Sequence, residues 1–326
     1  MDELLRVVGL KKYFRVGGKK FVKAVDGVDL EIRRGETLGL VGETGCGKST
    51  LGRTVLRLVE PTAGKIWFDG EELTHLKRKA LKLKRRSLQF IFQDPMASLD
   101  PRMTVENIIG EGLIIHGTKN REERRDQTIR ILEKIGMSPS SIDRFPSEFS
   151  GGQRQRIGIA RALVLEPKFL VADEPVSALD VSVQSQVLNL LAELKKDLGL
   201  TYLFVAHDLS VVSYISDRVA VMYLGKIIEI STTENIYKNP LHPYTQALLR
   251  AIPQIGGRQT NKEVLQGEVP SPISVPSGCA FRLRCPLAQP QCAIEEPKLR
   301  EFGTGHQVAC HLVGETHQIL NIQMSN

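Results

Sequence analysis

Residues 42–49 have the types and spacing that bind phosphate groups. They fit the pattern Gly-x-x-x-x-Gly-Lys-[Ser/Thr] and follow a short apolar segment, residues 36–41. The glycines let backbone N–H groups close around phosphates, Lys48 can reach the β- and γ-phosphates, and the Ser49 hydroxyl can bind Mg²⁺. A helix that begins at Lys48 would add its positive end. The candidate nucleotide-binding residues are Gly42, Glu43, Thr44, Gly45, Cys46, Gly47, Lys48, Ser49 and Thr50.

Two acidic residues follow a second apolar segment. Residues 169–172 (Phe-Leu-Val-Ala) are typical of a fully buried strand and lead into Asp173 and Glu174. Ligands of open α/β sheets bind at the carboxyl ends of strands. We therefore expect Asp173 to hold Mg²⁺ and Glu174 to polarise an attacking water.

A second helix start with exposed amides lies at residues 149–156. Ser150 is a good N-cap, Gly151 and Gly152 expose backbone N–H groups, and Gln153 follows within the first turn. Because the loop at residues 42–49 already supplies one phosphate cradle, this second one indicates the nucleotide of another molecule. A sandwich dimer with ATP at its interface is the simplest arrangement.

With these motifs the sequence resembles the ATP-binding cassette (ABC) family, whose signature is usually Leu-Ser-Gly-Gly-Gln; here Phe149 replaces the leucine. The resemblance implies further roles. Gln93 matches the Q-loop, which touches Mg²⁺ or the attacking water and senses the membrane partner. Residues 177–180 match the D-loop, which meets the opposite subunit. His207 matches the switch histidine that contacts the γ-phosphate, and Tyr13 the aromatic residue that stacks on adenine.

Four of the five cysteines crowd the last fifth of the chain, with the spacing C-x₅-C-x₆-C-x₁₇-C: they are Cys279, Cys285, Cys292 and Cys310. This region resembles the C-terminal extension of dipeptide/oligopeptide importer ATPases, a subfamily that includes nickel and glutathione systems. The thiols suit a [4Fe–4S] cluster, with zinc, free thiols or two disulfides as alternatives. His306 and His311 are alternative ligands, although surface positions are the simpler expectation. A metal would supply folding energy that a proline-rich tail lacks.

Two other features have simpler readings. Cys46 occupies a variable position of the phosphate loop and is expected to be a spectator, the alternative being a thiolate at a helix N-terminus. Residues 77–86 carry seven positive charges. A solvated helix face is favoured over a nucleic-acid or lipid surface because no aromatic residues interleave the charges.

The elements expected from hydrophobic periodicity alternate between strands and helices, which indicates an α/β fold. We expect a P-loop NTPase (RecA-like) parallel-sheet core with an antiparallel β subdomain, a helical signature subdomain and a small Cys-rich C-terminal extension. The expected cassette is residues 1–235, with its helical part at about 100–165, and the extension is residues 236–326. The expected elements are antiparallel strands in 1–30, strands at 36–41, 169–172 and 202–206, and helices at 49–58, 183–198 and 246–252.

The chain carries a net charge of +7, which selects no partner class by itself. No signal peptide and no apolar run of membrane-spanning length is apparent, so we expect a soluble protein at the cytoplasmic face of a membrane. The resemblance implies an ATPase that powers peptide import with permease subunits, an extracytoplasmic binding protein, and a second copy or homologue. The alternatives are a soluble ABC ATPase acting on nucleic acid or ribosomes, import of nickel or glutathione, and a regulatory module whose cysteines sense redox state or iron. No nucleic-acid partner is expected.

Overall fold

The computed structural model describes residues 2–252 and 267–314 and divides the chain into two compact units. Unit 1 comprises Met1–Leu5, Ile32–Thr37 and Trp67–Val205. Unit 2 comprises Arg6–Glu31, Leu38–Ile66 and Ala206–Asn326. The predicted extension therefore belongs to unit 2, except that its residues 253–266 and 315–326 lie outside the described part.

Unit 1 contains three parallel strands that pair in the order β6-β7-β8. Strands β7 and β8 are buried at every position, and most of their residues are apolar. A strand covered on both sides reads as a continuous hydrophobic run, which is why the sequence revealed them. Their bounds are β6 Leu88–Ile91, β7 Phe169–Asp173 and β8 Thr201–Val205.

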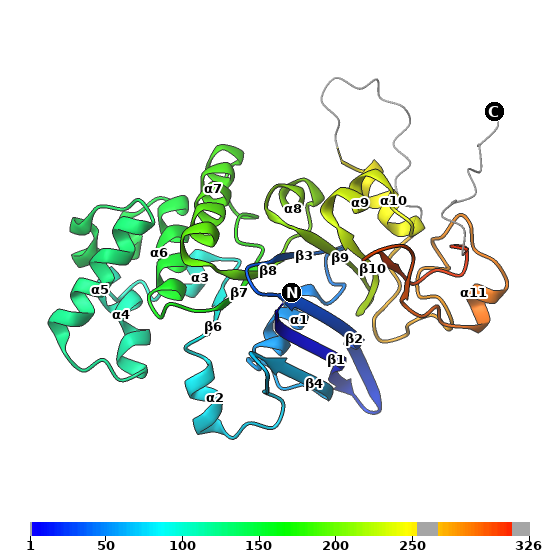
Figure 1. Ribbon diagram of the computed structural model, residues 1–326, viewed down its shortest axis with the longest axis horizontal. Helices are drawn as coiled ribbons and strands as arrows, with labels where there is room; N and C mark the ends of the chain where they lie inside the picture. Colours follow the sequence, from blue (N-terminus) through cyan, green and yellow to red (C-terminus); the bar gives the residue numbers. More distant parts are fainter. Residues whose placement is uncertain (1, 253–266, 315–326) are drawn as a thin grey trace. The chain divides into compact units, whose positions relative to one another are not determined.

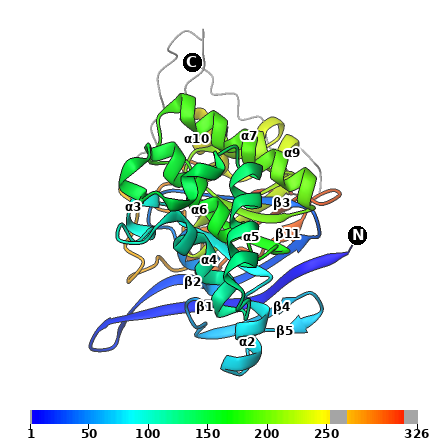
Figure 2. The same ribbon diagram turned by 90° about the vertical axis from the view of Figure 1, so that its left-hand side faces the viewer.

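Helices make up the rest of unit 1, and Figure 1 and Figure 2 show α4, α5 and α6 gathered into one group. Helix α7 connects β7 to β8 and ends at Gly199, whose φ of 62° is the left-handed conformation of a helix C-cap. Small elements at Glu71–Glu72 (β5), Pro139–Asp143 (η1) and Pro146–Glu148 (η2) complete the unit. The helices are α2 Arg78–Lys84, α3 Pro95–Ser98, α4 Val105–Ile115, α5 Arg121–Lys134, α6 Gly151–Leu163 and α7 Val181–Leu198.

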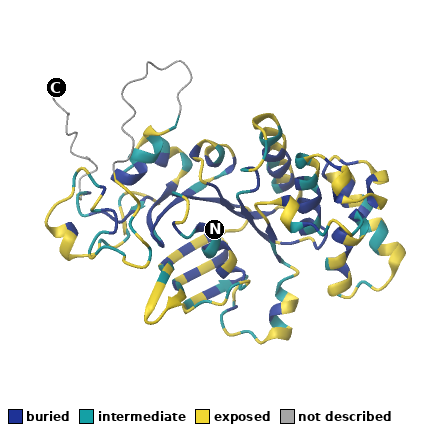
Figure 3. Cartoon of the chain, turned by 180° about the vertical axis from the view of Figure 1, so that it is seen from behind, coloured by how far each residue is buried: buried dark blue, intermediate teal, exposed yellow. Residues whose placement is uncertain are grey.

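The first strands of the chain form an antiparallel ribbon, as predicted. A tight turn at Gly18 joins β1 (Glu3–Gly17) to β2 (Lys20–Arg33), and β1 lies between β2 and β4 (Ala63–Phe68). The second half of β2 alternates between buried and exposed residues, which is visible as alternating blue and yellow in Figure 3. This pattern belongs to a sheet with one solvated face.

The other paired strands of unit 2 begin in the chain with β3 (Thr37–Val41). Strand β9 (Arg218–Tyr223) is parallel to β3 and forms a hairpin with β10 (Lys226–Thr232). The extension adds β12 to β10 and β11 to β12, both antiparallel. The extension thus continues the sheet of the cassette. Helix α9 (Thr233–Lys238) spans the predicted boundary, and the elements that follow it are α10 Pro243–Arg250, α11 Gln291–Ile294, β11 Arg300–Glu301 and β12 Gln307–Val308.

Apolar packing joins the extension to β9. Tyr223 of β9, Tyr244 of α10 and Phe281 form an aromatic cluster with ring centroids 4.8–5.4 Å apart. A second group of apolar side chains surrounds Val308 and Cys310. The extension therefore packs on apolar side chains of the cassette as well as on its own, a source of folding energy that its composition did not indicate.

In the part of the chain that the structure describes, no helix is both long enough and apolar enough to cross a bilayer. The basic run forms the short helix α2, with Leu81 buried and Lys84 paired to Glu71 at 2.6 Å. Most of its charged side chains are exposed, in agreement with the solvated-face interpretation.

Candidate functional site

The phosphate loop lies between β3 and helix α1 (Lys48–Val55) in unit 2. At two of its glycines, any residue with a side chain would clash with neighbouring backbone. A Cβ atom at Gly42 would lie 2.2 Å from the Met222 carbonyl oxygen, and one at Gly47 would lie 1.9 Å from that of Ala24. Gly47 also has a φ of 111°, which L side chains rarely adopt. The backbone of the loop is therefore packed against two neighbouring strands. Helix α1 ends before the predicted Leu58, since Arg57 adopts a φ of 51°.

The Lys48 side chain is buried within this loop. Its ammonium donates to the carbonyl oxygens of Gly42 (2.7 Å) and Glu43 (3.0 Å). Thr44 and Gly45 are exposed, while Ser49 and Thr50 are half-buried in the first turn of α1. Lysine and hydroxyl groups therefore gather at one helix start, as a phosphate site requires.

Cys46 is a buried residue of the same loop, with 3% of its surface exposed. Burial raises the pKa of its thiol above the usual value, despite the nearby Lys48 charge. A raised pKa keeps the thiol protonated at neutral pH, which argues against the thiolate alternative.

Tyr13 and His207 also belong to unit 2. Tyr13 is half-buried on β1 and its hydroxyl donates to Asp26; burial, with this bond, raises the pKa of Tyr13. His207 is exposed and follows Ala206, whose amide donates to the Leu40 carbonyl oxygen of β3 (3.1 Å). His207 therefore lies next to the end of the strand that leads into the phosphate loop.

The acidic strand end belongs to unit 1. Asp173 is the last residue of β7 and is 1% exposed. Glu174 has a φ of 46°, an unfavourable conformation for glutamate. Residues held in such conformations cluster at functional sites. The Gln93 amide, just after β6, donates to the Glu174 carboxylate at 2.9 Å. Two residues predicted from separate motifs thus meet.

The signature residues begin helix α6, also in unit 1. Ser150 and Gln153 form a capping box, in which the side chain of each bonds the backbone N–H of the other. Gly151 and Gly152 occupy the first turn. Phe149 is buried beneath the Arg144 guanidinium, 4.5 Å from the ring centroid, which accounts for an aromatic residue at this apolar position. The predicted D-loop is a turn in which Ser177 donates to the Glu174 carbonyl oxygen.

The structure therefore groups the predicted ATP-site residues into two sets. Tyr13, the loop from Gly42 to Thr50 and His207 are in unit 2. Gln93, Asp173, Glu174 and the signature are in unit 1.

The four C-terminal cysteines are free thiols, and none of them forms a disulfide bond among the described residues. Burial raises the pKa values of Cys279, Cys285 and Cys310, that of Cys285 to about 11, and the charges of neighbouring cysteines add to the effect. The amide of Cys279 donates to the Cys292 carbonyl oxygen at 2.8 Å. Among residues 2–252 and 267–314, however, no three His, Cys, Asp or Glu side chains are arranged to hold a metal ion. The structure does not support the predicted cluster.

The two candidate histidine ligands have other partners. His306 is buried, contrary to the expected surface position, and lies 2.8 Å from the Glu229 carboxylate of β10. His311 contacts the Glu295 carbonyl oxygen at 2.9 Å. The buried Glu229 explains the position of His306, because a buried carboxylate requires hydrogen-bond donors.

Sequence reasoning missed residues of the extension that contact the phosphate loop. Arg284 forms two hydrogen bonds with the Glu43 carboxylate, and the Tyr244 hydroxyl accepts the Glu43 amide. The sequence showed that Arg284 lies between Cys279 and Cys285. No neighbouring residue indicated that its partner is Glu43.

Comparison with known proteins agrees with these motifs. A family model described as ABC transporter matches residues 25–177, and one described as oligopeptide/dipeptide transporter, C-terminal region, matches residues 228–292. The chain is 55% identical over 313 residues to the putative oligopeptide transport ATP-binding protein YkfD of Bacillus subtilis, covering 95% of each. It is 51% identical to the oligopeptide transport ATP-binding protein OppF of Escherichia coli, covering 94% of this chain and 95% of OppF.

Solved ABC cassettes share the fold. A dimeric post-hydrolysis state of the cassette MJ0796, bound to ADP and Pi, is 29% identical with a TM-score of 0.64, covering 71% of this chain and 99% of that one. The cbiO1 protein of Clostridium perfringens, part of an ABC transporter complex, is 30% identical with a TM-score of 0.65, covering 73% and 92%. The predicted P-loop NTPase core is confirmed. The chain is a member of the ABC transporter family of ATP-binding proteins, in the oligopeptide/dipeptide transporter subfamily.

Proposed function

We propose that this chain hydrolyses ATP to power the uptake of dipeptides or oligopeptides through integral membrane permease subunits. The observation that carries the proposal is the phosphate loop, in which close-packed glycines surround a buried lysine at a helix start. Family membership and the similarity to YkfD and OppF, which are named as oligopeptide transport ATP-binding proteins, support the transport role. We place the chain at the cytoplasmic face of the membrane, held there by the permease.

The proposed roles of unit 2 concern ATP binding. Lys48, the loop amides and the first turn of α1 would hold the phosphates, and Tyr13 would stack on adenine. The Lys48 ammonium would exchange its carbonyl partners for phosphate oxygens. His207 would contact the γ-phosphate. Because Lys48 bonds to the loop carbonyl oxygens, its side chain is already ordered when ATP binds.

The proposed roles of unit 1 concern hydrolysis. Glu174 would accept a proton from the attacking water, and Gln93 would orient the Glu174 carboxylate through their 2.9 Å hydrogen bond. Gln93 would also sense the permease. Asp173 and Gln93 carry oxygen donors of the kind that Mg²⁺ prefers, as does Ser49 of unit 2. When bound, Mg²⁺ neutralises charge on the β- and γ-phosphates.

The signature is proposed to complete the site of a second chain. Ser150, Gly151, Gly152 and Gln153 would bind the nucleotide of a partner, which is a second copy or a homologue. A capped helix start with two glycines offers backbone N–H groups to such an anion.

The hydrolysis proposal is tested with Glu174→Gln in the full chain. We expect MgATP binding to persist, a dimer to accumulate on size exclusion with ATP, and hydrolysis to fall by about 100-fold or more. The matched control is Glu166→Gln, a substitution of an acidic residue outside the motifs. Normal turnover of Glu174→Gln would remove Glu174 from the role of base.

The transport proposal is tested with the chain co-expressed with its permease subunits in vesicles. We expect ATP-dependent accumulation of a labelled dipeptide or oligopeptide, unaffected by excess nickel or glutathione. Competition by either would instead assign that cargo. Copurification with RNA or DNA rather than with membrane subunits would contradict a transport role.

We also propose that the four cysteines bind a metal centre, a [4Fe–4S] cluster in preference to zinc. The supporting observation is that the fold brings cysteines from distant positions together, since the Cys279 amide donates to the Cys292 carbonyl oxygen at 2.8 Å. Binding would require the side chains to converge further. The test is protein purified without oxygen: about four irons and four sulfides per chain support the cluster, one zinc supports the alternative, and no metal contradicts both.

A further inference from the structure

The phosphate-loop residue Glu43 is held by the C-terminal extension through both its side chain and its backbone. Arg284 donates Nη1 to Glu43 Oε2 at 2.6 Å and Nη2 to Glu43 Oε1 at 2.9 Å. The Glu43 amide donates to the Tyr244 hydroxyl at 2.9 Å. All these residues belong to unit 2. Paired arginine–carboxylate bonds are directional and strong, so they fix where Glu43 lies.

Arg284 is itself held in place by its surroundings. Its side chain is 4% exposed, and its guanidinium carbon lies 6.0 Å from the Tyr223 ring centroid. The Arg284 amide donates to the carbonyl oxygen of Phe281, a member of the aromatic cluster with Tyr223 and Tyr244. Packing around Arg284 therefore fixes the position from which its guanidinium contacts Glu43.

The charge of Glu43 gives this contact a consequence for nucleotide binding. Glu43 directly follows Gly42, and its carbonyl oxygen accepts a hydrogen bond from the Lys48 ammonium. An uncompensated carboxylate in a loop that receives a triphosphate would repel the ligand. The Arg284 guanidinium neutralises that carboxylate and limits the positions that it can adopt.

We propose that Arg284 is a positioning residue for ATP, through which the C-terminal extension holds the phosphate loop in its receptive conformation. The proposal rests on the proposed nucleotide site. The extension is then part of that site. Without the extension, the Glu43 carboxylate would lose its arginine partner and the Glu43 amide would lose its hydrogen bond to Tyr244.

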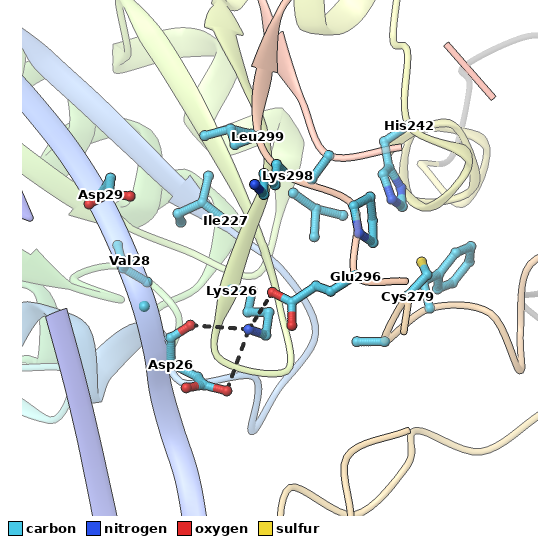
Figure 4. Close-up of a pocket in the computed structure, with 16 residues that line it drawn as sticks. Asp26, Val28, Asp29, Lys226, Ile227, His242, Cys279, Glu296, Lys298 and Leu299 are labelled. Atoms are coloured by element: carbon cyan, nitrogen blue, oxygen red, sulfur yellow. Dashed lines mark hydrogen bonds and ion pairs between the residues drawn. The ribbon is translucent and has the colours of Figure 1, made fainter. Parts of the chain in front are cut away.

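A second contact of the extension reaches the other part of the unit 2 site. Lys226 lies between Glu296 of the extension (2.7 Å) and Asp26 (3.4 Å), as Figure 4 shows. Asp26 in turn accepts the hydroxyl of Tyr13, the proposed adenine-stacking residue. Glu296 is 56% exposed, so this chain of contacts is expected to be weaker than the Arg284 contact.

The test measures MgATP affinity of the full chain by calorimetry for Arg284→Met, which keeps much of the side-chain length without the charge. We expect the Kd to rise about 5- to 100-fold, the range of typical coupling between sites. The KM for ATP should rise in parallel, with kcat at saturating MgATP close to wild type. The matched control is Arg282→Met, since Arg282 lies on the same segment and its guanidinium donates to the carbonyl and hydroxyl oxygens of Ser277 rather than to the phosphate loop.

Rescue separates an electrostatic role from a purely structural one. In the double variant Glu43→Gln/Arg284→Met the repelling charge is gone, so MgATP affinity should recover most of the loss. Added salt should weaken the defect of the single variant, because screening reduces repulsion. A double variant that binds as poorly as Arg284→Met would reject the charge argument.

A milder variant covers the case in which Arg284→Met does not fold. Tyr244→Phe keeps the ring in the aromatic cluster and removes only the acceptor of the Glu43 amide. We expect a loss of about fivefold in MgATP affinity, the equivalent of one hydrogen bond. If Tyr244→Phe and Arg284→Gln, which removes the positive charge, both bind MgATP like wild type, the proposal is overturned.

A separate variant distinguishes this result from failure of the ATP site itself. Lys48→Ala should abolish MgATP binding. Unchanged binding in Lys48→Ala would refute the proposed nucleotide site, and the proposal with it. Lost binding in Lys48→Ala together with wild-type affinity in Arg284→Met refutes only the role of the extension.

Discussion

Glu229 of β10 anchors the extension to the cassette, and replacing it should loosen that anchor. The side chain is completely buried. Its Oε1 accepts the Leu241 amide (2.7 Å) and lies 2.8 Å from His306 Nε2, while its Oε2 accepts the His242 amide (3.0 Å). One carboxylate thus connects a cassette strand to the start of α10 and to the residue just before β12.

The expected cost of Glu229→Gln follows from these three contacts. Glutamine keeps one oxygen, which Leu241 and His306 can share, but its NH₂ group then faces the His242 amide. One hydrogen bond to a charged group is lost and two buried donors oppose each other, so we expect a destabilisation of about 2–4 kcal/mol. Because the extension holds Arg284 and Tyr244, MgATP affinity should fall as well.

The assay is thermal unfolding combined with hydrogen exchange read by mass spectrometry. Faster exchange is expected in peptides that cover α10 and β12, with unchanged exchange in β7. The control is Glu234→Gln, which removes an exposed acid of α9 paired with Lys238 at 2.7 Å and should leave both measurements unchanged. If Glu229→Gln unfolds and exchanges like Glu234→Gln, the buried carboxylate does not anchor the extension.

Three further predictions concern single residues. Gly47→Ala should abolish MgATP binding in a chain that still folds, since its Cβ would lie 1.9 Å from the Ala24 carbonyl oxygen; normal binding by calorimetry would show that the loop can shift. Gln93→Ala should hydrolyse ATP about 10- to 100-fold more slowly at saturating MgATP, as Glu174 loses its 2.9 Å contact, and an unchanged rate would exclude this orienting role. Burial lowers the pKa of His242 from 6.5 to about 4, so the unfolded chain binds the proton more readily than the folded chain does. The free energy of unfolding should therefore decrease as the pH falls from 6.5 towards 4, by as much as about 3 kcal/mol. His242→Asn, which can still accept the Tyr244 amide, should show a shallower decline in urea titrations, and an equal decline would assign the loss to other groups.

The local structure of the segments proposed to bind nucleotide could be predicted, because each segment is short and its interacting residues are close in the chain. An apolar run buried on both faces predicts β7, and the acids that follow it lie where a parallel strand ends. The phosphate loop needs glycines within a few residues of Lys48, and the capping box of α6 spans Ser150 to Gln153. In each case the residues that interact are neighbours in the chain.

The extension was harder to predict because its stability comes from distant partners. Composition indicated a proline-rich tail in need of a metal, whereas the structure packs Tyr244 and Phe281 on Tyr223 of the cassette. No local pattern shows that a tail shares its core with a strand that precedes it. The same limit applied to His306, whose buried partner Glu229 lies 77 positions earlier.

The sequence by itself determined the family of the chain, the loop proposed to receive phosphate and the residues proposed for hydrolysis, because each depends on spacing within one segment. Only the tertiary structure decided that Gln93 meets Glu174 and that Arg284 meets Glu43, 241 positions apart. Contacts of this kind depend on how strands and loops from distant parts of the chain pack together. Packing of the whole fold keeps unpaired charges out of the interior and removes apolar surface from water. The sequence of a single segment does not show how this is achieved, because the partners lie in other segments.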